Sequence, residues 1–211
     1  MNITLTKLGK RFNTDWIFRN LDFQFEDGKH YAITGPNGSG KSTLLQLISG
    51  SAVYNEGNIY YLENEKPFSA DKIFQKISFA APYLDMIEEM TLLEFFSFHH
   101  KMKGWLPALG TKEIIHLSSL ENAAHKQIRY FSSGMKQRVK LAQAIFSNVP
   151  VVLLDEPLTN LDAEGVSLYH RLIDKYCQNR LLIISSNDKK EYSFCDEIID
   201  VTDFKKVAGR N

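Results

Sequence analysis

The fold is decided by the stretch Gly35-Pro36-Asn37-Gly38-Ser39-Gly40-Lys41-Ser42-Thr43, called the phosphate loop below. It matches the pattern G-x-x-x-x-G-K-S, in which glycines let the backbone approach phosphate oxygens at angles that a β-carbon would forbid. Successive amide groups then form an anion site, and the following helix adds the positive end of its dipole. In this pattern Lys41 supplies a cation to the outer phosphates, and the Ser42 hydroxyl is a ligand for Mg²⁺.

The segments on either side of the phosphate loop support this interpretation. His30–Thr34 reads as a short apolar strand, and Ser42–Ser49 reads as a helix with leucines and an isoleucine on one buried face. Further upstream, apolar and polar residues alternate, which is the pattern of half-buried strands. The apolar members of these strands are Ile3, Leu5, Leu21, Phe23 and Phe25.

The rest of the chain alternates between strand and helix patterns. Val149–Leu154 and Leu181–Ser185 are continuous apolar runs of the kind buried in a parallel sheet. Helical periodicity runs from about residue 91 to 144, with breaks at Pro107 and Gly110. Strands alternating with helices predict an α/β fold with a mostly parallel sheet, and the helical block predicts an inserted lobe.

A pair of acids follows the first of these apolar runs. Asp155 and Glu156 would lie at the carboxyl edge of the sheet, where ligands bind in such folds. There Asp155 is placed to hold Mg²⁺ through its water shell, and Glu156 to orient or deprotonate an attacking water. A positioned base of this kind contributes about 10²- to 10⁴-fold to a rate.

Composition and the length of the apolar runs bear on the partners and location of the chain. The chain has 211 residues, with 25 Lys and Arg against 25 Asp and Glu. This balance of charges gives no reason to expect a nucleic-acid partner, because proteins that bind the phosphate backbone carry a basic excess. The N-terminus lacks a signal-peptide core, and the apolar runs are far shorter than the ~20 residues that span a bilayer. Cys177 and Cys195 fit no metal motif. We therefore expect a soluble, cytoplasmic chain that reaches a membrane only through a partner.

Two further segments give the sequence a family resemblance. Phe131-Ser132-Ser133-Gly134-Met135-Lys136-Gln137-Arg138, the signature segment below, resembles the LSGGQ signature of ABC transporter ATP-binding subunits, and Glu156–Asp162 resembles their Walker B end and D-loop. With the phosphate loop, three ordered motifs cover essentially the whole chain. The resemblance implies a single domain, 1–211, of the small type. It would have a P-loop NTPase core with an N-terminal antiparallel β subdomain (1–83 and 141–211) and an inserted helical subdomain (84–140).

The resemblance also implies a function. Such a subunit hydrolyses ATP with Mg²⁺ in a head-to-tail dimer, formed with a second copy or a paralogue. Ser132, Ser133 and Gly134 of one chain would cap the γ-phosphate bound to the phosphate loop of the other. The dimer would drive a separate transmembrane permease from the inner face of the membrane. An aromatic ring near the N-terminus would stack on adenine; Phe12 is the candidate and Trp16 its rival.

Two positions depart from the family pattern, and both bear on the rate. Pro82 stands where the family has a glutamine that touches Mg²⁺ and the attacking water, and proline has no side-chain oxygen. Asn187 stands where the family has a histidine against the γ-phosphate, and asparagine cannot carry a positive charge. We therefore expect ATP binding with slow or partner-stimulated hydrolysis. A soluble ABC-type ATPase without a transport role, or a regulatory ATP-binding partner of a more active paralogue, remains an alternative.

Overall fold

The strands form two sheets in the computed structural model, which describes residues 1–205. An antiparallel sheet has the order β2-β1-β4-β5. Its strands are β1 (Asn2–Phe12), β2 (Asp15–Phe25), β4 (Glu56–Glu63) and β5 (Lys66–Phe68). A parallel sheet has the order β6-β7-β8-β3-β9. Its strands are β3 (His30–Thr34), β6 (Ile77–Ala80), β7 (Val151–Asp155), β8 (Leu181–Ser185) and β9 (Glu197–Asp200).

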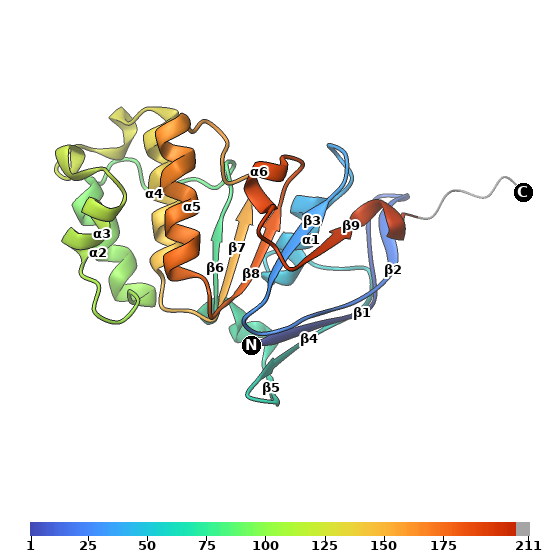
Figure 1. Ribbon diagram of the computed structural model, residues 1–211. Coiled ribbons are helices and arrows are strands. Elements are labelled where there is room, and N and C mark those ends of the chain that lie inside the picture. The colour runs from blue at the N-terminus through green and yellow to red at the C-terminus, as the bar shows by residue number, and fades with distance from the viewer. Residues whose placement is uncertain (206–211) are drawn as a thin grey trace, which may run out of the picture.

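The helices lie on both faces of the parallel sheet and at one end of the molecule. In Figure 1 the helices α2 and α3 lie at the end opposite the antiparallel sheet, with the parallel sheet between them. The helices are α1 (Lys41–Ile48), α2 (Leu92–Lys103), α3 (Thr111–Leu117), α4 (Ser133–Phe146), α5 (Ala163–Tyr176) and α6 (Lys189–Tyr192). Short 3₁₀ helices cover Ala70–Gln75, Glu121–Ala123, Ile128–Tyr130 and Val201–Phe204.

The position of strand β7 between two core clusters explains why its sequence is apolar without interruption. Val152 and Leu154 belong to the core cluster that includes residues of α4 and α5. Val151 and Leu153 belong to the second cluster, which includes α1 and the antiparallel sheet. Successive side chains of a strand point to opposite faces, so a strand covered on both faces must be apolar at every position.

The predicted fold class is confirmed, with differences in detail. The α/β architecture has a parallel sheet, an N-terminal antiparallel sheet and a helical insertion. The sequence did not predict α5 or β9. The division into a core and a helical subdomain at residues 84–140 stays a prediction, and α4 runs across its second boundary, from Ser133 to Phe146.

The strand order places three loops side by side. Strand β8 lies between β7 and β3, and all three strands run in the same direction. The phosphate loop after β3, the acids at the end of β7 and the segment Ser186–Asp188 after β8 therefore meet at one carboxyl edge of the sheet. Ligands of open α/β sheets bind at this edge.

Candidate nucleotide-binding site

Three glycines give the phosphate loop a backbone that other residues do not tolerate. Gly35, Gly38 and Gly40 have φ values of 134°, 78° and 106°. A β-carbon at Gly40 would also lie 2.2 Å from Cγ2 of Ile17, which is a clash between heavy atoms. These positions need glycine because only glycine adopts positive φ without strain and leaves room for the neighbouring strand.

The side chain of Lys41 is held at the phosphate loop. It is 5% exposed, and its Nζ donates hydrogen bonds to the carbonyl oxygens of Gly35, at 2.8 Å, and Pro36, at 3.4 Å. Within residues 1–205 the buried Ser39 hydroxyl has no hydrogen-bond partner. A cation and an unpartnered donor at the same loop fit an anionic ligand.

A cavity of about 340 Å³ opens over the phosphate loop. Phe12 lines it and is 54% exposed, while Trp16 does not line it. The Trp16 ring instead contacts two guanidinium groups, those of Arg11 at 5.5 Å and Arg19 at 4.6 Å from its ring centroid. The geometry therefore favours Phe12 over Trp16 as the ring for a base. The remaining lining residues are Ile17, Asn37, Gly38, Gly40, Lys41, Ser42, Thr43 and Glu156.

The carboxylate of Asp155 fits a magnesium site. It is 1% exposed, and within the described residues neither of its oxygens has a hydrogen-bond partner. Burying an unpartnered carboxylate is costly unless a cation or its waters compensate. Mg²⁺ prefers oxygen ligands and keeps several waters, so the Ser42 hydroxyl and the Asp155 carboxylate are a suitable donor set.

Glu156 has an unusual backbone and an exposed side chain at the same cavity. Its φ is 43°, and its amide donates to the carbonyl oxygen of Ser185 at 2.9 Å. A non-glycine residue in the left-handed region costs about 1–3 kcal/mol, and such strain clusters at functional sites. The strained backbone places the Glu156 carboxylate beside the phosphate loop rather than in the sheet.

The structure places Asn187 and Pro82 differently with respect to the phosphate loop. The Asn187 side-chain amide donates to Oδ1 of Asn37 at 3.0 Å, so this residue touches the loop. Pro82 follows β6 and offers only its carbonyl oxygen, which accepts from Lys140 Nζ. Neither residue lines the cavity over the phosphate loop.

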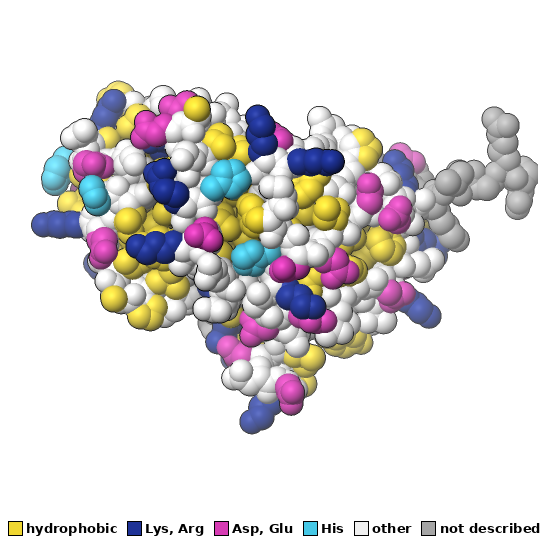
Figure 2. All heavy atoms as spheres, in the orientation of Figure 1, with side chains coloured by type: hydrophobic (Ala, Val, Ile, Leu, Met, Phe, Trp, Pro, Cys, Tyr) yellow, Lys and Arg dark blue, Asp and Glu magenta, His cyan; other side chains and the backbone are white. Residues whose placement is uncertain are grey.

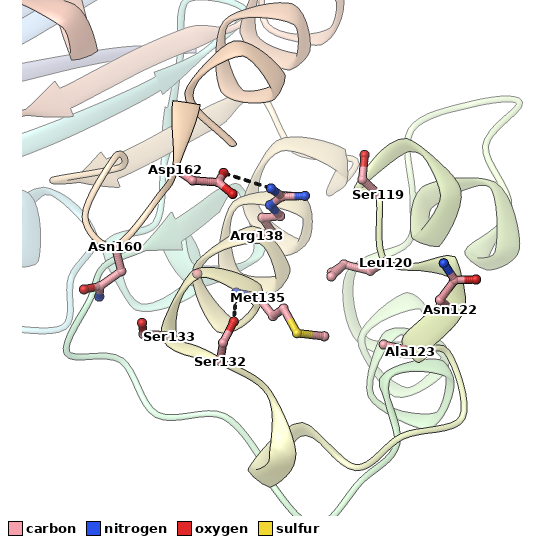
Figure 3. A pocket seen from close by; sticks show the side chains of 11 residues that line it. Ser119, Leu120, Asn122, Ala123, Ser132, Ser133, Met135, Arg138, Asn160 and Asp162 are labelled. Carbon is pink, nitrogen blue, oxygen red and sulfur yellow. Dashed lines mark hydrogen bonds and ion pairs between the residues drawn. The ribbon is translucent and has the colours of Figure 1, made fainter. Parts of the chain in front are cut away.

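The signature segment lines a separate pocket of about 410 Å³ (Figure 3). Ser132 caps helix α4 by accepting a hydrogen bond from the amide of Met135 at 3.2 Å. A β-carbon at Gly134 would lie 2.9 Å from the carbonyl oxygen of Asn160, so glycine permits a close approach of the two segments. The pocket has no lining residue in common with the cavity over the phosphate loop.

An ion pair fixes the segment after β7 against α4. Arg138 donates to the Asp162 carboxylate at 3.1 Å, as Figure 3 shows. The pKa of Asp162 is lowered, first by the hydrogen bond from the Gly165 amide and then by Arg138. Ser119 and Asn122 also line this pocket, and no sequence pattern had indicated them.

Glu191 is a buried acid that the sequence analysis missed. It is 4% exposed, and one carboxylate oxygen accepts from the Leu158 amide at 2.7 Å, while the other has no partner within the described residues. Burial, reinforced by the nearby charges of Asp188 and Glu156, raises the pKa of Glu191 to about 7. Glu191 thus joins helix α6, which follows the Asn187 segment, to the segment after Glu156.

Replacing Glu191 by glutamine is expected to change the pH dependence of stability. Between pH about 4.5 and about 7, native Glu191 keeps a proton that the unfolded chain releases, so wild-type stability falls as pH rises through this window. Glu191→Gln keeps the acceptor for Leu158 and removes the buried charge. We expect the variant to be more stable than wild type by about 1–3 kcal/mol at pH 8, with a much smaller difference at pH 5.

Chemical denaturation at both pH values measures this difference, with Glu65→Gln, at an exposed turn, as the control. A Glu191→Gln effect of the same size at pH 5 and pH 8 would contradict the assignment.

The fold and this site define a P-loop nucleoside triphosphatase. The chain belongs to the ABC transporter family, whose model matches residues 18–159. It is 32% identical over 207 residues to the uncharacterized ABC transporter ATP-binding protein YybJ of Bacillus subtilis, covering 94% of this chain and 92% of that one. It is 29% identical over 197 residues to the cytochrome c biogenesis ATP-binding export protein CcmA of Reclinomonas americana, covering 88% and 84%.

Solved structures share the fold. A putative ABC transporter ATP-binding protein from Pyrococcus furiosus superposes with a TM-score of 0.80 at 22% identity, covering 98% of this chain and all (100%) of that one. The dimeric structure of a bacterial ABC transporter cassette gives 0.81 at 24% identity, covering 94% and 93%. The resemblance in the three motifs is thus confirmed: the chain is an ATP-binding subunit of an ABC transporter and hydrolyses ATP to drive transport. No helix within residues 1–205 is both long and apolar enough to cross a bilayer.

Proposed function

We propose that the chain works as a head-to-tail dimer with a second copy or a paralogue. The supporting observation is that the phosphate loop and the signature segment line separate cavities with no lining residue in common. Serine hydroxyls and amides at the start of α4 form a second anion site, which a single chain does not use on its own nucleotide. The experiment that tests this is to mix a variant defective at Lys41 with one defective at Ser133.

Each residue of the site has a role in this proposal. Phe12 stacks on adenine, the phosphate loop and Lys41 hold the triphosphate, and Ser42 and Asp155 hold Mg²⁺. The metal, when bound, neutralises charge on the phosphate oxygens. Glu156 orients the attacking water and accepts its proton. Ser132, Ser133 and Gly134 of the partner chain cap the γ-phosphate.

We further propose that hydrolysis is slow because of Asn187. Its amide is engaged with Asn37 and supplies no positive charge to a phosphate. A histidine there can donate a hydrogen bond and, when protonated, a charge.

Asn187→His is expected to raise the steady-state ATPase rate by about 10²-fold, which is the low end of the effect of a positioned acid or base. A phosphate-release assay at saturating MgATP measures it, with Asn64→His, in the turn between β4 and β5, as the matched control. An unchanged rate in Asn187→His would remove this position as the limit on turnover.

An apolar groove supports a membrane partner. A pocket of about 280 Å³ lies between α2 and the segment that leads into β6, and exposed Phe74 (60%) and Met102 (70%) line it. We propose that a separate permease inserts a cytoplasmic helix here, holding the chain at the inner face of the membrane. Across the face in Figure 2, acidic and basic side chains are interspersed. Purification of the tagged chain from detergent-solubilised membranes tests this, and recovery without any multi-span protein counts against it.

A further inference from the structure

The position after β6 has a side chain that can replace the missing glutamine. Tyr83 directly follows Pro82, and its hydroxyl accepts a hydrogen bond from Nε2 of Gln46 at 3.3 Å. Gln46 lies on α1 four residues after Ser42, so both side chains lie on the same face of that helix. The Tyr83 hydroxyl is therefore tied to the helix face that carries a predicted magnesium ligand.

The loop that carries Tyr83 also lies near the other predicted magnesium ligand. Strands β6 and β7 are neighbours with Ala80 opposite Leu154, so the loop after β6 lies beside Asp155. A tyrosine hydroxyl can both donate and accept a hydrogen bond.

We infer that Tyr83 is a positioning residue for Mg²⁺: its hydroxyl, bonded to Gln46 and carried by the loop beside Asp155, holds the water shell of the ion that Ser42 and Asp155 bind. Mg²⁺ keeps several of its waters in proteins, so a hydroxyl that orients those waters compensates for the missing side-chain oxygen at Pro82. The inference rests on the proposed function, because it requires MgATP at Ser42 and Asp155.

Tyr83→Phe tests the inference, because it removes the hydroxyl and leaves the ring. ATP affinity of the full chain is measured by calorimetry, once with Mg²⁺ and once with EDTA. We expect the gain in affinity from Mg²⁺ to fall by about tenfold, which is the usual cost of losing an outer-shell partner of a metal, while the affinity in EDTA is unchanged. Tyr60→Phe, on the exposed face of β4, is the matched control and is expected to behave as wild type.

Gln46→Leu provides a second variant. It removes the partner that orients the Tyr83 hydroxyl, and we expect a smaller loss of the Mg²⁺-dependent gain, again without effect in EDTA. The inference would be overturned if Mg²⁺ raised the ATP affinity of Tyr83→Phe as much as it raises that of the wild type. An equal loss of ATP affinity in Mg²⁺ and in EDTA would overturn it as well. The proposed function would instead be overturned if ATP affinity did not change when Mg²⁺ is removed from the wild type, and did not change in Lys41→Ala either.

Discussion

Glu156→Gln is expected to lower the steady-state rate of ATP hydrolysis by about 10²- to 10⁴-fold and to leave the affinity for ATP within a few-fold of wild type. The substitution keeps the shape of the side chain and removes the group that accepts a proton from water. Lys41, Ser42 and Asp155 stay in place, so binding of the triphosphate is retained. A phosphate-release assay and calorimetric titration with MgATP measure the two quantities.

The same variant is expected to accumulate as a dimer when MgATP is present. If closure of two chains over ATP precedes hydrolysis, blocking hydrolysis traps the closed form, which light scattering detects as a doubled mass. Glu65→Gln is the matched control, because Glu65 is also an exposed glutamate with positive φ but lies in the turn between β4 and β5. A Glu156→Gln chain that hydrolyses ATP at the wild-type rate would exclude Glu156 as the base.

The parts of the fold that the sequence predicted are those with an unbroken physical pattern. Strands β7 and β8 are buried on both faces, so every position is apolar and the run is easy to recognise. The phosphate loop was predictable because its glycines are required by backbone angles at fixed spacing. Strand β9 was not, because its Ile198 is 59% exposed and its Glu197 is exposed as well, so the strand has no apolar run.

The parts of the site that were missed depend on contacts between distant segments. Glu191 and Leu158 are far apart in sequence, and no local pattern indicates that the acid is buried against the segment after Glu156. Tyr83 was passed over because a change from glutamine to Pro82 suggested a lost ligand, whereas its neighbour reaches Gln46. The choice between Phe12 and Trp16 required knowing which ring faces the cavity.

Mixing two inactive variants is expected to restore nucleotide trapping. One chain carries Lys41→Ala and the other Ser133→Glu, and both carry Glu156→Gln so that ATP stays bound. Alone, the first chain lacks the cation at every site, and the second places a negative charge against every γ-phosphate. In a head-to-tail dimer of the two, both defects fall in one site and the other site is intact, so about one ATP per dimer is trapped.

The stoichiometry of this mixture separates two arrangements of the site. If Lys41 and Ser133 of the same chain completed one site, every site in the mixture would carry a defect, and trapped nucleotide would stay at the background of the single variants. Radiolabelled ATP retained through gel filtration measures it. The matched control pairs Lys41→Ala with a second Lys41→Ala chain of distinguishable size. Retention in the mixture no higher than in this control would contradict the head-to-tail dimer, because no site of the mixture would then be intact.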